Sequence, residues 1–337
     1  MVISTVFGEA EVVPQTLDFA RDEAPLPQFM NGMFSYSLWW VIIHRDWYLF
    51  HGNMDYLQKQ RDYLLALLDL MNGYDESNLP AGFLDWPTSP HEEAVQSGLC
   101  ALVSMAFRAG GQLCRALNED STRLLCEAAA TRWAERNVFH CGIKTTAALM
   151  ALAGMLPAGK ANSEVLASDP LRDISTFYGY YVLQARAQAA DHQGCLDVIR
   201  RYWGAMLDFG ATTFWEDFNL DWTHNAARID ELVPPGKCDI HADFGVYCYK
   251  GLRHSLCHGW AAGPSAWLSE HVLGFRPLAP GCRQILIDPH LADLQWARGS
   301  FPAPEGVVRV SHKRLENGRI ETEVSAPETV KVVTNCP

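Results

Sequence analysis

The chain has 337 residues, of which 48% are hydrophobic and 20% are charged. This composition is typical of a chain that folds around a core, and the length suffices for one large domain and a small one. The formal net charge of −12 would repel phosphates, so we expect no nucleic-acid partner. No apolar run approaches the roughly 20 residues of a membrane-spanning helix, so we expect no membrane partner.

The first nine residues lack a basic region and reach an acid at once. They therefore predict no signal peptide, and the sequence as given is expected to be cytoplasmic. A longer relative with its own leader could be secreted or periplasmic. The ten cysteines form no CxxC pair, which favours reduced thiols over a disulfide framework. Cys238, His241, Cys248 and His258 could be drawn as a zinc site, but their spacing matches no structural zinc template. We expect neither a metal nor another cofactor. The sequence leaves the oligomeric state open.

The apolar pattern up to residue 274 predicts helix after helix. The expected helices are Gln15–Glu23, Ser35–Phe50, Asp55–Met71, His91–Leu117, Ser121–Arg136, Lys144–Leu156, Ser163–Ala167, Asp173–Ala190, Gln193–Phe209 and Leu256–Val272. Helices without intervening strands fit a toroid of helical hairpins as well as a bundle. The stretch between Phe209 and Leu256 is long, irregular and aromatic, and such a stretch in a helical domain is usually functional.

The pattern changes to short β segments after residue 274. Asn317-Gly318 predicts a tight turn between two strands, because it supplies the positive φ angles that a hairpin needs. The expected strands are Gln284–Ile287, Val307–Lys313, Arg319–Val324 and Thr329–Val333. We therefore expect a mainly α helical domain over residues 1–274 and a small antiparallel β domain over 275–337.

One stretch, Gly-Ala-Thr-Thr-Phe-Trp-Glu-Asp at 210–217, combines aromatics with carboxylates. An aromatic ring can stack on a sugar while a carboxylate activates water, which is the pairing that glycoside hydrolysis needs. The sequence therefore indicates Glu216 as a candidate catalytic carboxylate. The alternative is a glutamate that stabilises a helix start.

The same block resembles the one that carries the catalytic base in the α-L-rhamnosidases of glycoside hydrolase family 78. Ser-Leu-Cys-His-Gly-Trp-Ala-Ala-Gly-Pro at 255–264 is similar to that family's histidine-bearing final barrel helix. Leu-Gly-Phe-Arg-Pro at 273–277 and Ile-Asp-Pro at 287–289 resemble its entry into a C-terminal β domain. The similarity covers nearly the whole chain.

This resemblance implies an (α/α)6 toroid, as in six-hairpin glycosidases, followed by a β-sandwich-like domain. It also implies hydrolysis of terminal α-L-rhamnosyl residues with inversion, with Glu216 as general base and a rhamnosylated glycoside or oligosaccharide as the substrate. The implied substrate-binding residues are His258, Asp85, Trp86, Trp215, Trp39 and Trp40. Because Trp39 and Trp40 are adjacent on a helix, at most one should face the sugar.

In that family the general acid lies in an Arg-Asp-rich motif that is followed by a Trp and a Gly-Asp pair, and no Arg-Asp-Arg…Trp…Gly-Asp pattern occurs in this sequence. We therefore expect an N-terminally incomplete barrel, with Asp85 as the best substitute acid and Asp221, Asp239 and Asp243 as further candidates. A catalytically impaired or non-catalytic carbohydrate-binding fragment is the alternative function. A lyase or another glycosidase on an (α/α)6 barrel is a third, which the two family-like blocks disfavour.

Overall fold

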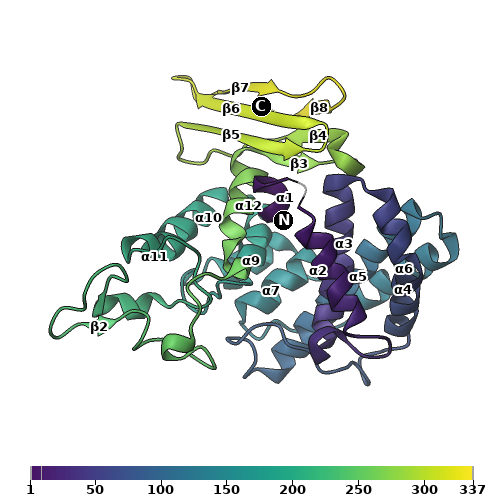
Figure 1. Ribbon diagram of the computed structural model, residues 1–337, viewed down its shortest axis with the longest axis horizontal. Coiled ribbons are helices and arrows are strands. Elements are labelled where there is room, and N and C mark those ends of the chain that lie inside the picture. Colours follow the sequence, from purple (N-terminus) through teal and green to yellow (C-terminus); the bar gives the residue numbers. More distant parts are fainter. Residues whose placement is uncertain (1, 9, 336–337) are drawn as a thin grey trace.

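The computed structural model describes residues 2–8 and 10–335 (Figure 1). The outer ends of the two expected domains, Met1 and Pro337, and one cysteine, Cys336, lie outside the described residues. Helices form most of the lower part of the molecule, and the C-terminal strands β3 to β8 lie above them in the view of Figure 1. The expected mainly α fold with a C-terminal β region is confirmed.

In the lower part, the most extensive contacts between helices join α5 with α6, α3 with α5, and α7 with α9. The α-helices are α1 (Val2–Val6), α2 (Val12–Asp22), α3 (Phe34–His51), α4 (Met54–Asn72), α5 (Glu92–Ala116), α6 (Asp120–Ala134), α7 (Lys144–Leu152), α8 (Ala158–Ala161), α9 (Gly179–Gln188), α10 (His192–Val198), α11 (Gly204–Asp208) and α12 (Gly263–Trp267).

Short 3₁₀ or π turns connect or extend these helices. They are η1 (Met30–Gly32), η2 (Asn162–Leu166), η3 (Ile199–Trp203), η4 (Leu220–His224), η5 (Gly251–Arg253), η6 (Gly259–Ala262), η7 (Leu268–Val272) and η8 (Pro280–Cys282). Local chemistry explains the α3–α4 corner. Helix α3 ends at Gly52, whose φ of 65° suits glycine, and the Asn53 side chain then caps α4 by accepting the Tyr56 N–H.

The last helical segment begins later than the sequence predicts. The residue His258 is extended, with φ −127° and ψ 115°, and the first turn after it is η6. Pro264 then occupies the first turn of α12, where its missing N–H is tolerated. The expected helix over Leu256–Val272 is therefore wrong in its first residues, and His258 lies in a loop.

The β region contains two three-stranded sheets, in the orders β3-β4-β8 and β5-β6-β7. Their strands are β3 (Phe275–Pro277), β4 (Gln284–Ile287), β5 (Trp296–Ala303), β6 (Gly306–Arg314), β7 (Ile320–Ser325) and β8 (Lys331–Thr334). All pairs are antiparallel except β4 with β8, which is parallel. A separate parallel pair, β1 (Ala226–Ala227) and β2 (Cys238–Asp239), lies in the long irregular stretch.

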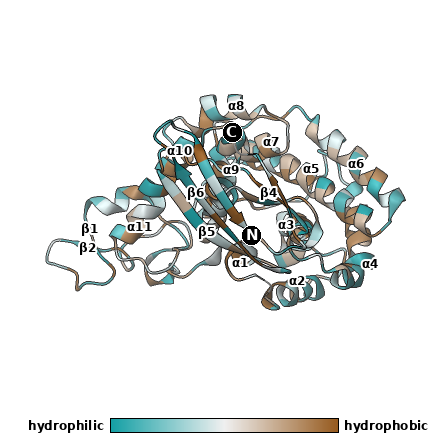
Figure 2. Cartoon of the chain, turned by 90° about the horizontal axis from the view of Figure 1, so that it is seen from above, coloured by the Kyte–Doolittle hydropathy of each residue, from teal (hydrophilic) through white to brown (hydrophobic). Residues whose placement is uncertain are grey.

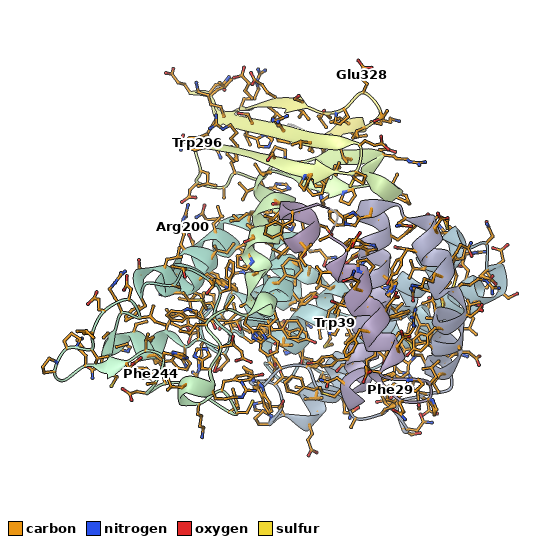
Figure 3. The ribbon with its side chains drawn as sticks, in the orientation of Figure 1. Phe29, Trp39, Arg200, Phe244, Trp296 and Glu328 are labelled. Carbon is orange, nitrogen blue, oxygen red and sulfur yellow. The ribbon has the colours of Figure 1, made fainter. Side chains whose placement is uncertain are left out.

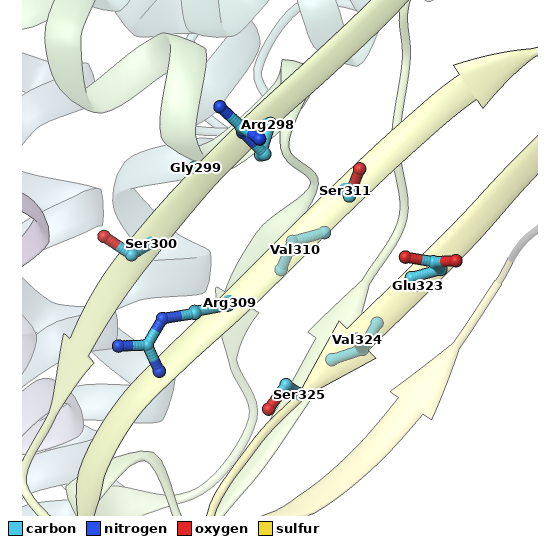
Figure 4. Close-up of a pocket in the computed structure, with 9 residues that line it drawn as sticks. All are labelled: Arg298, Gly299, Ser300, Arg309, Val310, Ser311, Glu323, Val324 and Ser325. Atoms are coloured by element: carbon cyan, nitrogen blue, oxygen red, sulfur yellow. The ribbon is translucent and has the colours of Figure 1, made fainter.

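The β5-β6-β7 sheet separates polar from apolar side chains. Its outer face carries residues such as Arg298, Arg309 and Glu323 (Figure 4), whereas Phe301 and Val308 are buried beneath it. Figure 2 shows these strands lying across the helices. Trp296, 66% exposed, lies at one edge of the sheet (Figure 3).

The helical part contributes to the core of the β region. Phe50, in the last turn of α3, packs in one cluster with Phe275 and Phe301. The Cys282 thiol in η8 donates to the Phe50 carbonyl at 3.3 Å. The two parts are therefore joined through shared apolar packing. None of the described helices is both long and apolar enough to cross a membrane.

Candidate functional site

The two sequence blocks that carry the family resemblance lie against each other. The Glu216 N–H donates to the Ser255 carbonyl at 2.9 Å, and the His258 N–H donates to the Phe214 carbonyl at 2.8 Å. The Thr213 hydroxyl also donates to the Leu256 carbonyl. Residues 213–217 and 254–258, about 40 positions apart in the chain, thus form one hydrogen-bonded platform.

The two carboxylate oxygens of Glu216 have different surroundings. Oε2 accepts the Ser255 N–H at 2.9 Å and lies 3.5 Å from the Arg253 guanidinium. Oε1 lies 3.7 Å from His258 Nδ1 and accepts no hydrogen bond from any described residue. The side chain is only 5% exposed. One oxygen therefore fixes the carboxylate, and the other is left to bind a water or a substrate.

Glu216 lines a small cavity whose other walls are largely aromatic. Its volume is about 20 Å³, which is room for about one water molecule. The lining residues come from five parts of the chain: Phe83, Asp85, Trp86 and Pro87; Ser175, Thr176 and Phe177; Glu216 and Asp217; Tyr247 and Tyr249; and Trp260. A pyranose ring fits only if part of this wall moves.

Residues 244–253, which include Tyr247 and Tyr249, form the wall that covers Trp86. The Tyr247 ring stacks on Trp86 with centroids 5.6 Å apart and an interplanar angle of 18°. The Trp86 indole N–H donates to the Tyr249 hydroxyl at 2.7 Å. The stacking face that the sequence assigns to a sugar is thus occupied by a tyrosine.

Trp260, which also lines the cavity, is held by the backbone of Glu216. Its indole N–H donates to the Glu216 carbonyl at 2.9 Å, and the Thr176 hydroxyl donates to the same carbonyl at 2.5 Å. The Trp260 ring also stacks on Phe177 at 5.4 Å and 8°, and lies 4.4 Å from the His258 ring. This wall positions an aromatic ring and an imidazole beside the free oxygen of Glu216.

Asp85 is buried and engaged by protein donors. Its Oδ1 accepts the Thr88 N–H at 3.0 Å, and its Oδ2 accepts the hydroxyls of Thr145 and Ser175, both at 2.8 Å. The carboxylate joins the loop before α5 to the start of α7 and the loop before α9. In this arrangement Asp85 positions the adjacent Trp86 and is poorly suited to donate a proton.

Asp217, the residue after Glu216, also lines the cavity. Its N–H donates to His254 Nε2 at 3.0 Å, and its Oδ2 is buried without a hydrogen-bond partner. Burial raises the pKa of the Asp217 carboxyl to about 6, while the nearby N–H groups of Phe218 and Val246 oppose this rise. Burial also lowers the His254 pKa to about 4, so this imidazole stays neutral and accepts the bond.

Three predicted tryptophans do not reach the cavity. Trp215 is 1% exposed and packs in an apolar cluster against Phe218. Trp40 is 2% exposed and donates to the Leu17 carbonyl, and Trp39 donates to the Tyr178 hydroxyl. In this structure all three rings are core side chains, and none of them lines the cavity.

The long stretch 209–256 supplies residues that the sequence did not single out, namely Tyr247, Tyr249 and Arg253. Its length and aromatic content were the signal, but its folding back over Trp86 cannot be inferred from pattern. Asp239 and Asp243 are used in a turn: Asp239 accepts the His241 N–H, and Asp243 accepts the Asp239 N–H. In the described part of the chain, no three His, Cys, Asp or Glu side chains are placed to hold a metal ion.

Comparisons with known proteins agree with the motifs. Residues 274–335 match the family model described as the bacterial alpha-L-rhamnosidase C-terminal domain. An alpha-L-rhamnosidase of Alteromonas sp. (strain LOR) is 24% identical over 323 residues, covering 85% of this chain. The chain spans 33% of that relative's length.

Solved structures show the same fold. The GH78 family rhamnosidase of Bacillus sp. GL1 aligns with a TM-score of 0.77 and 23% identity, over all of this chain and 37% of that protein. The Streptomyces avermitilis alpha-L-rhamnosidase complexed with L-rhamnose aligns with a TM-score of 0.64 and 16% identity, over 89% of this chain and 28% of that protein. The resemblance to family 78 rhamnosidases is thereby confirmed for a chain about a third as long.

Proposed function

We propose, from this confirmed resemblance to the α-L-rhamnosidases, that the chain hydrolyses terminal α-L-rhamnosyl residues with inversion and that Glu216 is its general base. The observation that carries the proposal is the unequal use of the two Glu216 oxygens. Oε2 is held by the Ser255 N–H, whereas Oε1 accepts no hydrogen bond from described residues, and Glu216 lines the aromatic cavity. A fixed carboxylate with one open oxygen suits a base that orients water.

In this mechanism a water molecule lies between Oε1 and the anomeric carbon, on the face opposite the leaving group. Glu216 takes a proton from that water as the carbon–oxygen bond to the sugar forms. The anchored Oε2 keeps the carboxylate from rotating, so that the geometry is set before the substrate binds. The proton required by the leaving oxygen comes from a second carboxylic acid.

The sugar-binding groups follow from the same geometry. His258 lies close enough to Glu216 to hydrogen-bond a hydroxyl of a sugar bound there, and Trp260 offers an apolar wall. Trp86 becomes a stacking platform once Tyr247 is displaced. Asp85 acts indirectly by holding the loop that carries Trp86.

A second candidate function, carbohydrate binding without hydrolysis, is favoured by the carboxyls around the cavity. An inverting enzyme needs an acid roughly 6.5–9.5 Å from the base, with the sugar and water between them. Of the other carboxyls that line the cavity, Asp85 is engaged by three donors, and Asp217 directly follows Glu216 in the chain.

Hydrolysis of 4-nitrophenyl α-L-rhamnoside separates the two functions. We expect Glu216→Gln to reduce kcat by about 10²–10⁴-fold, with the affinity for L-rhamnose changed only a few-fold. Exposed Glu164→Gln serves as the control and should behave as the wild type. L-Rhamnose binding without any turnover supports the second function, and turnover that survives Glu216→Gln contradicts the role of Glu216.

A further inference from the structure

A second, larger cleft lies directly beside the Glu216 cavity. Its volume is about 690 Å³, within the roughly 300–1,000 Å³ range of small-molecule sites. Pro87, Asp217 and Tyr247 line both the cavity and this cleft. The two spaces are therefore neighbours that share a wall, and the exposed Tyr247 side chain forms part of that wall.

The cleft combines an apolar floor with a charged rim. Tyr202 and Phe218, both buried, lie in its floor, and the Tyr202 hydroxyl donates to the Phe218 carbonyl at 2.7 Å. The rim carries the side chains of Asp169, Arg172, Asp173, Arg201, Asn219 and Asp221. A sugar ring has the matching character, because its C–H faces are apolar and its hydroxyls both donate and accept.

Several rim groups remain available for a ligand. Arg201 makes no ion pair within residues 2–8 and 10–335, and the only ion pair within the rim joins Arg172 and Asp173 at 3.5 Å, where both side chains are 74% exposed. Such exposed pairs are weak. Binding a polyhydroxylated group would therefore cost little in broken contacts.

The charge of the cleft restricts the kind of ligand. Four carboxyls (Asp169, Asp173, Asp217 and Asp221) face two guanidiniums (Arg172 and Arg201), a formal balance of −2. A carboxylated sugar would be repelled, and a flat apolar group would cover charged side chains without pairing them. A neutral sugar avoids both penalties.

We propose that this cleft binds the sugar unit that carries the terminal rhamnosyl residue, so that the substrate is a neutral oligosaccharide. The inference rests on the proposed function, since it assumes that the rhamnosyl residue occupies the Glu216 cavity. Displacement of Tyr247 admits the rhamnosyl ring to the Glu216 cavity. It also opens the shared wall, so that the cavity and the cleft form one continuous groove.

Calorimetric titration with L-rhamnose and with rutinose, a neutral rhamnosyl-glucose disaccharide, tests the proposal. We expect rutinose to bind the wild type at least about tenfold more tightly than L-rhamnose. Arg201→Ala should remove most of this advantage while changing the affinity for L-rhamnose less than about twofold. Arg200→Ala, which alters the neighbouring arginine that pairs with Asp293 outside the cleft, is the matched control and should retain the advantage.

Each result has a distinct meaning. Equal affinities for the two sugars in the wild type overturn the cleft assignment and leave the proposed function standing. No binding of either sugar contradicts the proposed function and this inference with it. A rhamnosyl-glucuronic acid disaccharide should bind about tenfold more weakly than rutinose at pH 7.5, and equal or tighter binding would refute the assignment to neutral sugars.

Discussion

Two buried carboxylates that look alike in sequence are held in different ways. Asp85 and Glu216 each stand beside a tryptophan, are 4% and 5% exposed, and line the same cavity. Asp85 gives both oxygens to protein donors, whereas Glu216 keeps one oxygen open. Hydrogen-bond partners, which sequence does not show, separate a positioning residue from a candidate base.

Replacing Asp85 tests this distinction. We expect Asp85→Ala to lower the free energy of unfolding by about 3 kcal/mol, because it leaves the Thr88 N–H and two hydroxyls without their acceptor. Urea denaturation measures the change, and Asp62→Ala, at a side chain 91% exposed, should alter it by less than about 0.5 kcal/mol. Full stability combined with lost L-rhamnose binding would show instead that Asp85 ligates the sugar.

A third buried acid, Glu270 in η7, predicts a pH effect on stability. Burial raises its pKa to about 7, against the opposing hydrogen bonds from the Tyr180 hydroxyl and the Gln184 amide. Between about pH 4.5 and 7 the folded protein keeps this proton and the unfolded chain does not. Native stability therefore falls as pH rises through that window.

Glu270→Gln removes the titration and retains a neutral acceptor for both donors. We expect the variant and the wild type to have nearly equal unfolding free energies at pH 4.5. The advantage of the variant should then grow with pH, to about 3 kcal/mol above pH 7. The comparison of unfolding free energies at pH 5, 6, 7 and 8 measures this difference. A difference that is constant with pH would contradict the assignment.

At the scale of elements, the sequence predicted the regular parts better than the connections. Apolar periodicity located α3, α4 and α5, and Asn317-Gly318 located the β6–β7 turn, where Gly318 has φ 83°. The last helix was predicted too early, because Leu256 and His258 bond to Thr213 and Phe214 of a distant segment instead of forming a helical turn. Contacts between distant segments override local pattern there.

The 244–253 segment has a tight bend that offers a direct test of its covering role. Gly245 has φ 119°, and a methyl group there would clash with the Tyr249 carbonyl oxygen. We expect Gly245→Ala to open the segment and speed hydrogen exchange of the Tyr249 and Gly251 amides, which bond to the Val246 and Phe244 carbonyls, by more than about tenfold.

Gly236→Ala is the matched control, because Gly236 also has a positive φ of 84° but nothing lies within 4 Å of the added methyl. It should carry only the conformational cost of about 1 kcal/mol and leave exchange in 244–253 unchanged. Equal exchange in both variants would mean that this segment is not held closed by the bend at Gly245.

At the scale of the whole molecule, a division near residue 274 remains our domain assignment, although the core crosses it. The residue Phe50, 3% exposed, packs with Phe275, Phe301 and Val308 from the β region. Sequence composition located the change from helices to strands, but it contains no signal that an α3 side chain completes the β core. We therefore expect the two parts to unfold together.

Phe50→Ala should separate them. Loss of the buried ring is expected to cost about 3–5 kcal/mol and to convert one calorimetric transition into two, with the β region melting first. Phe19→Ala, at a side chain 65% exposed, should leave the single transition in place. Two transitions already in the wild type would contradict this coupling.

The role of Glu216 is tested most directly by following the anomer that forms first. In a proton NMR time course with an α-L-rhamnoside, we predict that β-L-rhamnose appears before mutarotation and that Glu216→Gln slows its appearance by at least about 100-fold. First formation of α-L-rhamnose, or an unchanged rate in Glu216→Gln, would contradict the assignment of Glu216 as the base of an inverting rhamnosidase.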